Sequence, residues 1–277
     1  MKRLSNKIQR TDISLTKTYI FKDSLAMRFQ EASKYDKFSF LRERGNIALF
    51  SNPLVVERAI QPYKSYPSSK KLALKASATG SLHPMFEVMS NRRSTRNFAN
   101  YSLSTQEIYN ILHYSYGITG EAEVRNGKGM WHYRAVPSGG ALYPLEIYLY
   151  INNSVLEKGL YHYKIDTEEL EELDLTDSME FLAQNIAASN INLQQCSCII
   201  FITSMLQRQM IKYGERGYRF ILQEVGAVLQ NISLSCEAQS LGSCILGGYM
   251  DDHLNEWMKI ESPFETIQGV IVIGKLK

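Results

Sequence analysis

Three short segments of this chain combine arginine, serine and glycine in patterns that suit a flat, phosphorylated ligand. Arginine side chains offer several fixed donors to a phosphate group, and paired glycines let main-chain N–H groups approach a flat ligand with no Cβ between them. Alone, an arginine-rich segment is typical of solvated surface and a glycine pair is typical of a turn. Together, the three segments predict a pocket for a planar cofactor that carries a phosphate. They are residues 92–96 (Arg-Arg-Ser-Thr-Arg), 137–144 (Pro-Ser-Gly-Gly-Ala-Leu-Tyr-Pro) and 246–249 (Leu-Gly-Gly-Tyr).

The order and the flanks of these segments resemble the nitroreductase-like family of FMN-binding proteins, in which a basic motif precedes a Pro-Ser-Gly-Gly loop. The closer resemblance is to the SagB-type branch of that family. Members of this branch are azoline dehydrogenases, which turn thiazoline and oxazoline rings of modified peptides into thiazoles and oxazoles. The resemblance covers roughly residues 86–277, and residues 1–85 match only loosely. The closer match is carried by residues 137–149, 160–163 and 212–219.

The resemblance implies one FMN site built from several segments. Two arginines and a hydroxyl would hold the phosphate, the glycine-rich loop of a partner subunit would line the pyrimidine side of the ring, and a glycine pair would present N–H groups near N5 and O4. A basic residue after the last strand would also reach the phosphate, and Lys277 is an alternative to Lys275 in this role. The residues are Arg92, Ser94 and Arg96, with Arg93 beside them or facing solvent; Pro137, Ser138, Gly139 and Gly140; Gly247 and Gly248; and Lys275.

The oxidation of an azoline also requires a base, because the ring loses a proton from one carbon and a hydride from its neighbour. From the residues alone, Lys212 and Tyr213 are typical of a lysine with a buried stem beside a packed ring. The resemblance implies instead that this pair is catalytic. Burial or nearby positive charge, such as Arg216 and Arg219, would lower the lysine pKa from about 10.4 and make the amine a better base.

The composition predicts a soluble globular protein with a substantial core. The 277 residues are 44% apolar, and a formal net charge of +3 without a basic cluster argues against nucleic acid as a partner. The longest apolar runs are too short to cross a membrane, and the N-terminus lacks a signal-type apolar core, so a cytoplasmic location is expected. The four cysteines and five histidines show no metal-ligand spacing, so no metal is expected.

Hydrophobic periodicity predicts the elements that position these motifs. Ser104 and Glu107 form a capping-box pattern that opens a helix through about His113. Alternation over residues 145–151 predicts a strand with one buried face. Apolar residues at helical spacing predict a long helix over residues 215–240, which is either a central core helix or a dimer-interface helix, and the resemblance favours the dimer. Further strands are expected at residues 159–165, 197–204 and 268–274.

This pattern indicates an α+β fold, and the resemblance implies a nitroreductase-like α/β sandwich with a central, mostly antiparallel sheet. The Pro- and Ser-rich residues 61–82 predict an exposed connection between two parts. These parts are an N-terminal extension of uncertain role, residues 1–85, and an FMN-binding domain, residues 86–277.

Three functions compete. The first is an FMN-dependent oxidase of azoline rings, with molecular oxygen as the final oxidant, a precursor peptide as substrate and a cyclodehydratase complex as partner. The second is an NAD(P)H-dependent nitro- or quinone reductase on the same fold. The third is a non-catalytic scaffold subunit of a peptide synthetase complex. The Lys-Tyr pair and the Pro-Ser-Gly-Gly loop favour the first, whereas the sequence identifies neither the peptide nor the preferred ring.

Overall fold

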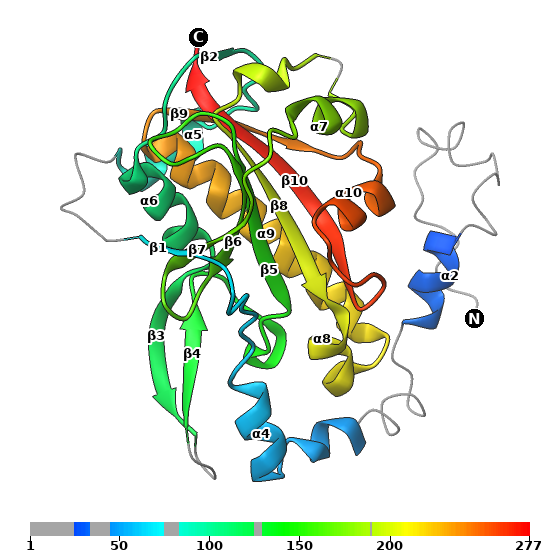
Figure 1. The fold of residues 1–277 in the computed structure, drawn as a ribbon. Helices are drawn as coiled ribbons and strands as arrows, with labels where there is room; N and C mark the ends of the chain where they lie inside the picture. Colours follow the sequence, from blue (N-terminus) through cyan, green and yellow to red (C-terminus); the bar gives the residue numbers. More distant parts are fainter. Residues whose placement is uncertain (1–24, 34–44, 75–82, 125–128, 189) are drawn as a thin grey trace. The chain divides into compact units, whose positions relative to one another are not determined.

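The computed structural model describes residues 25–33, 45–74, 83–124, 129–188 and 190–277. The chain divides into two compact units, Met1–Arg42 and Glu43–Lys277. The described part of the first unit contains helix α2 (Leu25–Ala32). All other described elements belong to the second unit (Figure 1).

The second unit is built on an eight-stranded sheet with the order β1-β7-β6-β5-β8-β10-β2, and β9 also pairs with β10. All pairings between its named strands are antiparallel. The expected α+β class with a central antiparallel sheet is therefore confirmed. The strands are β1 (Lys71–Ala73), β2 (Phe98–Ala99), β5 (Leu145–Ile151), β6 (Gly159–Lys164), β7 (Glu169–Asp174), β8 (Cys198–Met205), β9 (Leu241–Leu246) and β10 (Glu265–Leu276), and β3 (Ile118–Glu123) with β4 (Met130–Arg134) forms a separate ribbon.

Helices cover both faces of this sheet and enclose two apolar clusters. On one face α6 (Thr105–Tyr116) and α9 (Arg216–Ala238) pack against the sheet. On the other face lie α7 (Met179–Asn185) and α10 (Asp251–Trp257). Helix α6 begins with the expected capping box between Ser104 and Glu107, and the long helix expected over 215–240 is α9. The remaining helices are α4 (Pro53–Ala59), α5 (Met85–Asn91), α8 (Leu206–Tyr213) and the short η2 (Gly139–Ala141) and η3 (Leu193–Gln195).

The central strand β5 is buried on both faces, whereas its alternation predicts one buried face. Tyr148 and Tyr150 belong to the second apolar cluster, and each hydroxyl donates a hydrogen bond to a carboxylate, to Glu265 and Asp177 respectively, both at 2.8 Å. A tyrosine ring tolerates full burial when its hydroxyl is paired. The prediction was wrong because it treated these tyrosines as the polar side of the strand.

Of residues 61–82, for which an exposed connection is expected, residues 61–74 are described and residues 75–82 lie outside the described part of the chain. The described residues are extended and several are exposed, as expected, but they are held against the sheet. Lys71, Leu72 and Ala73 make up strand β1, which pairs with β7 at the edge of the sheet. Pro62 is buried, and the carbonyl oxygen of Pro62 accepts a hydrogen bond from Arg134 Nη2 at 3.3 Å. Prolines and serines that suggest a linker here instead shape an extended segment held by the sheet.

Candidate active site

The glycine-rich loop, residues 137–144, folds back on itself before strand β5. Gly140, Ala141 and Tyr143 all have positive φ angles, of 67°, 54° and 45°. The Ser138 hydroxyl oxygen accepts a hydrogen bond from the N–H of Tyr143 at 2.9 Å and so closes the turn. Such backbone is costly for residues other than glycine, so the surrounding contacts must hold it in place.

Lys212 and Tyr213 meet this loop at Gly140. A Cβ placed on Gly140 would lie 2.7 Å from both Lys212 Nζ and the Tyr213 hydroxyl oxygen. Both side chains come from the last turn of α8, which ends at Tyr213 and has Gly214 as its C-cap residue. The structure therefore brings together two of the motifs that the sequence singled out, although they lie about seventy positions apart in the chain.

The environment of Lys212 suits an amine that exchanges protons. Burial lowers the pKa of Lys212, because the charged form loses hydration. Its Nζ lies 4.4 Å from the centroid of the Phe50 ring and 5.5 Å from that of Tyr213. The Tyr213 ring packs edge-on against Phe220 of α9, with centroids 5.0 Å apart. Chemically, this pair can accept and orient a proton next to the loop.

Two buried polar residues that were not selected from the sequence support the loop. The first is Gln209 of α8, whose Nε2 donates to the carbonyl oxygen of Gly139 at 3.0 Å. A Cβ on Gly139 would lie 2.3 Å from that nitrogen, so a side chain at position 139 would displace the Gln209 amide. The available signal was the position of Gln209 one turn before Lys212 on the same helix.

The second is Glu224 of α9, which is 2% exposed and lies behind the loop. Tyr116 donates its hydroxyl to Glu224 Oε1 at 2.8 Å and accepts from the N–H of Leu145 at 3.2 Å. Burial raises the pKa of Glu224 to about 7, against the opposing effects of the Ser138 and Tyr116 hydroxyls and the charge of Arg134. A single carboxyl within the apolar stripe of a long helix was the signal that could have identified it.

The arginine motif lies after α5, against strand β9. The N–H of Thr95 donates to the carbonyl oxygen of Ser243 at 2.8 Å, and Ser94 forms a bridge with the same residue. Arg92 is half-buried, while Arg96 is exposed. The exposed Arg93 donates to the carbonyl oxygens of Ser90 and Arg92, so its guanidinium is held by nearby backbone.

Lys275 lies at the same end of the sheet as the arginine motif. In β10 it pairs with Ala99 of β2 on one side and with Leu241 of β9 on the other. Its Nζ lies 5.4 Å from the centroid of the Tyr101 ring. Lys275, Arg92, Ser94 and Arg96 lie at the same end of the sheet by their backbone pairings and are called here the arginine group.

Gly247 and Gly248 follow the same strand, β9, that carries Ser243. Four residues of extended chain place Gly247 about 13 Å from Ser243. A Cβ on Gly247 would meet no atom within 4 Å, whereas one on Gly248 would lie 3.0 Å from the Cβ of Ala187. The carbonyl oxygen of Gly248 accepts from the N–H of Ala187 at 2.8 Å. Gly247 therefore offers open backbone, and Gly248 allows close packing.

The loop with Lys212 and Tyr213, called here the loop group, lies at the opposite end of the sheet from Lys275. Leu145, which follows the loop, and Thr266 of β10 are both paired with Ser204 of β8. Lys275 lies nine residues further along β10, which corresponds to about 30 Å of strand. Within one chain, the structure therefore places these predicted residues in two groups at opposite ends of the sheet, and Gly247 and Gly248 follow β9 at a level between them.

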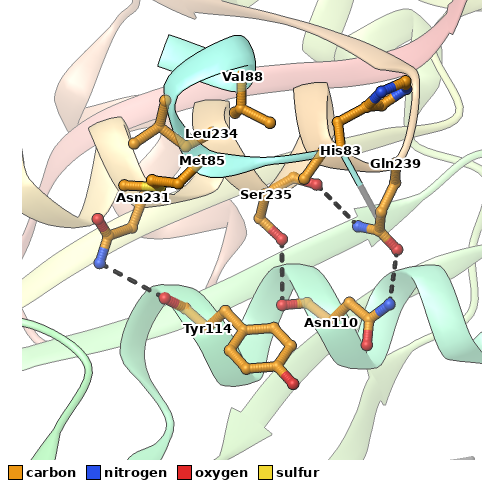
Figure 2. Close-up of a pocket in the computed structure, with 10 residues that line it drawn as sticks. His83, Met85, Val88, Asn110, Tyr114, Asn231, Leu234, Ser235 and Gln239 are labelled. Carbon is orange, nitrogen blue, oxygen red and sulfur yellow. Dashed lines mark hydrogen bonds between the residues drawn. The ribbon is translucent and has the colours of Figure 1, made fainter. Parts of the chain in front are cut away.

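A separate cavity of about 270 Å³ lies between α5, α6 and α9 (Figure 2). Its polar side chains bond to the protein around it: Asn110 donates to Gln239 at 2.9 Å, and Ser235 donates to the carbonyl oxygen of Asn110 at 3.2 Å. None of the residues expected in the site lines it. In the described parts of the chain, no group of three His, Cys, Asp or Glu could hold a metal ion, and no helix is long and apolar enough to span a membrane.

Comparison with known proteins identifies related sequences over most of the second unit. Residues 89–275 match the model of the nitroreductase family. MJ1384 of Methanocaldococcus jannaschii, which is named as a nitroreductase, is 30% identical over 176 residues, which are 63% of this chain and 84% of that protein. The microcin B17-processing protein McbC of Escherichia coli is 26% identical over 144 residues, which are 50% of this chain and 52% of McbC.

Solved structures show the same fold. A chain from Anabaena variabilis, named as a nitroreductase, has a TM-score of 0.68 at 23% identity and covers 91% of this chain. A chain of the Escherichia coli microcin synthetase McbBCD complex with truncated pro-MccB17 has a TM-score of 0.57 at 22% identity, and the match covers 76% of this chain and 79% of that one. The chain spans 46% of the Anabaena protein and about half of McbC.

Proposed function

Since this chain belongs to the nitroreductase family, we propose that it is an FMN-dependent enzyme that oxidises azoline rings of a ribosomally made peptide to azoles. The observation that carries the proposal is the meeting of Lys212 and Tyr213 with Gly140 of the glycine-rich loop. A partly buried amine beside that loop suits proton removal from a ring. The relationship to McbC, a protein named for processing microcin B17, supports a peptide as the substrate.

The residues present fit FMN. Arg92, Arg96 and Lys275 would hold the phosphate, because together they offer three cationic side chains at one end of the sheet. Gly247, with open space where a Cβ would lie, would let backbone N–H groups approach the flat ring. When bound, FMN supplies the acceptor for the two electrons that leave the azoline as a hydride.

Lys212 performs the proton transfer in this proposal. An azoline becomes aromatic when one ring carbon loses a proton and its neighbour loses a hydride, so the neutral amine of Lys212 accepts the proton. The Tyr213 hydroxyl orients that amine or relays the proton, because both groups face the same backbone position of Gly140. Gln209 and Glu224 keep the loop in the conformation that this requires.

The proposed site is completed by a second copy of the chain. One FMN cannot contact the arginine group and the loop group of the same chain, because about 30 Å of strand separates them. A homodimer would bring the arginine group of one protomer to the loop group of the other. The exposed side of α9 supports this arrangement, since Leu222 is 44% exposed and Gly226 has no atom within 4 Å of its Cβ position.

The proposed partners are a precursor peptide and the cyclodehydratase complex that forms its azoline rings. The fold likeness to a chain of the McbBCD synthetase supports this, since that structure is a complex of subunits with a truncated precursor peptide bound. Cyclodehydration must come first, because only a ring that has already closed can lose hydrogen to become an azole.

The test is to incubate the purified, FMN-loaded protein in air with a synthetic azoline peptide and without NAD(P)H. The expected result is a loss of two hydrogen atoms per ring by mass spectrometry, with oxygen consumed.

The relationship to MJ1384 favours a second candidate, an NAD(P)H-dependent nitro- or quinone reductase. Consumption of NAD(P)H with nitro or quinone substrates, and an azoline peptide left unchanged, would establish that reductase instead.

A further inference from the structure

The segment before β1 is a fixed part of the second unit. Lys64 forms an ion pair with Glu265, which is 4% exposed in its side chain. Ser65 Oγ and the N–H of Tyr66 both donate to Glu171 Oε1 at 2.9 Å. These buried contacts anchor residues 62–66 on the sheet, and with them the preceding helix α4, which ends only three residues earlier.

The same anchor continues to the helix that carries Lys212. Glu171 Oε2 lies 2.9 Å from His162 Nδ1, His162 Nε2 lies 3.0 Å from Glu146 Oε2, and Arg208 of α8 donates to Glu146 Oε1 at 2.6 Å. Burial opposes a charge on His162, but the Glu146 and Glu171 carboxylates raise its pKa. The protonated imidazole therefore lies between two negative charges. These contacts therefore fix helix α8 in position relative to α4 and residues 62–66.

Between α4 and α8 the structure leaves a cavity of about 660 Å³, called here the α4–α8 cavity. This volume is within the range of ligand pockets. Two apolar side chains on opposite walls remain open to solvent, Leu54 at 70% and Ile211 at 55% exposure. The apolar part of the lining consists mainly of Phe50, Leu54, Val55, Leu142 and Ile211.

The cavity borders the candidate base. Phe50 lines it and also lies under Lys212 Nζ, 4.4 Å from ring centroid to nitrogen. Leu142 of the glycine-rich loop lines it as well. A molecule whose ring reaches Lys212 would therefore extend its neighbouring groups into this space. Arg58 and Arg208 at the cavity disfavour a cationic neighbour.

We propose that the α4–α8 cavity is the subsite that receives apolar side chains of the peptide substrate beside the ring being oxidised. The assignment rests on the proposed function and deepens it by naming the preferred neighbours of the ring. A cavity of this size accommodates one or two apolar side chains, and their burial provides the preference. The N-terminal segment thereby becomes part of the substrate site.

Binding of two labelled probe peptides tests the proposal without requiring turnover. Each peptide contains a finished thiazole, flanked by leucine in one probe and by serine in the other, and each is titrated with the full-length, FMN-loaded protein by fluorescence anisotropy. The leucine probe should bind roughly tenfold more tightly than the serine probe, the preference expected for burying one or two apolar side chains. Leu54→Glu and Ile211→Glu, which place a charge on opposite walls, should each remove that preference.

Leu49→Glu is the matched control, because Leu49 is 49% exposed in the same segment but does not line the cavity. It should retain the full preference. Equal binding of both probes by the wild type, or a preference that survives both cavity variants, would overturn the subsite even if the protein oxidises azolines. A wild type that binds neither probe and oxidises no azoline would remove the proposed function and the subsite together.

Discussion

The Nζ atom of Lys212 lies 2.7 Å from the position that a Cβ would take on Gly140. Gly140 also has a φ angle of 67°, which side chains rarely adopt. A residue with a side chain at position 140 would therefore meet two obstacles, strained backbone and the displaced groups of Lys212 and Tyr213. The absence of a side chain at Gly140 therefore allows Lys212 and Tyr213 of helix α8 to lie against the loop.

Gly140→Ala should consequently destabilise the fold by about 1–3 kcal/mol and displace Lys212 from the loop. Thermal unfolding measures the first effect, and the pH dependence of amine labelling at Lys212 measures the second. Gly120→Ala is the control, because a Cβ there would meet no atom closer than 3.9 Å. Unchanged stability and labelling in the Gly140 variant would show that the two elements do not depend on each other.

Lys212→Ala and Tyr213→Phe should leave FMN bound but abolish azoline oxidation, with a loss of about 10²–10⁴-fold for removal of a proton-transfer group. In the wild type, kcat/KM should rise with pH through the pKa of Lys212, because only the neutral amine accepts a proton. That pKa is lowered from 10.5 by burial, so the rise should lie below pH 10.5. Flavin absorbance and peptide mass spectra measure both properties, and normal turnover in both variants would refute the role.

Glu224 should make the protein less stable as the pH rises. Its pKa is raised to about 7 in the fold from an ordinary 4.5, so the protonated carboxyl is favoured by folding. The resulting stabilisation is complete below pH 4.5 and is lost as the pH rises through 7, which amounts to about 3 kcal/mol.

Glu224→Gln should remove this dependence, because the amide resembles the protonated carboxyl and does not titrate. Urea unfolding of both proteins from pH 5 to 8 provides the measurement. The free energy of unfolding of the variant should exceed that of the wild type increasingly toward pH 8. A constant difference across this range would mean that Glu224 does not titrate in the folded protein.

Much of this fold could be predicted from local patterns. The capping box of Ser104 with Glu107 and the apolar periodicity of α9 depend on neighbours a few residues apart, so both were readable in the sequence. The family could be recognised because its motifs are short and keep their order. The burial and pairing of the Glu224 carboxyl and the hydrogen bond from Ser65 to Glu171 could not be predicted, since their partners lie more than one hundred residues away.

Glu146→Gln should destabilise the protein by about 3 kcal/mol, because the amide no longer balances Arg208 and His162 in a buried position. The pKa of Glu146 is lowered to about 2, chiefly by the charge of Arg208 overcoming burial. Its contribution is therefore present above pH 4.5 and lost as the pH falls toward 2.

Lys158→Met, which breaks the exposed pair with Asp177, should change the free energy of unfolding by less than about 1 kcal/mol.

The separation of the arginine group from the loop group predicts complementation between two inactive chains. Arg96→Ala combined with Lys275→Ala removes cations from one group, and Lys212→Ala disables the other. If each FMN site joins the arginine group of one protomer to the loop group of its partner, a mixed dimer contains one intact site. Random mixing of equal amounts should then restore about a quarter of the wild-type oxidation, because half of the dimers are mixed and each has one working site of two. Co-expression followed by the azoline assay measures this, with each variant alone as the control. Activity no higher than that of the single variants would mean that each site is built within one chain or that the two groups do not share a flavin.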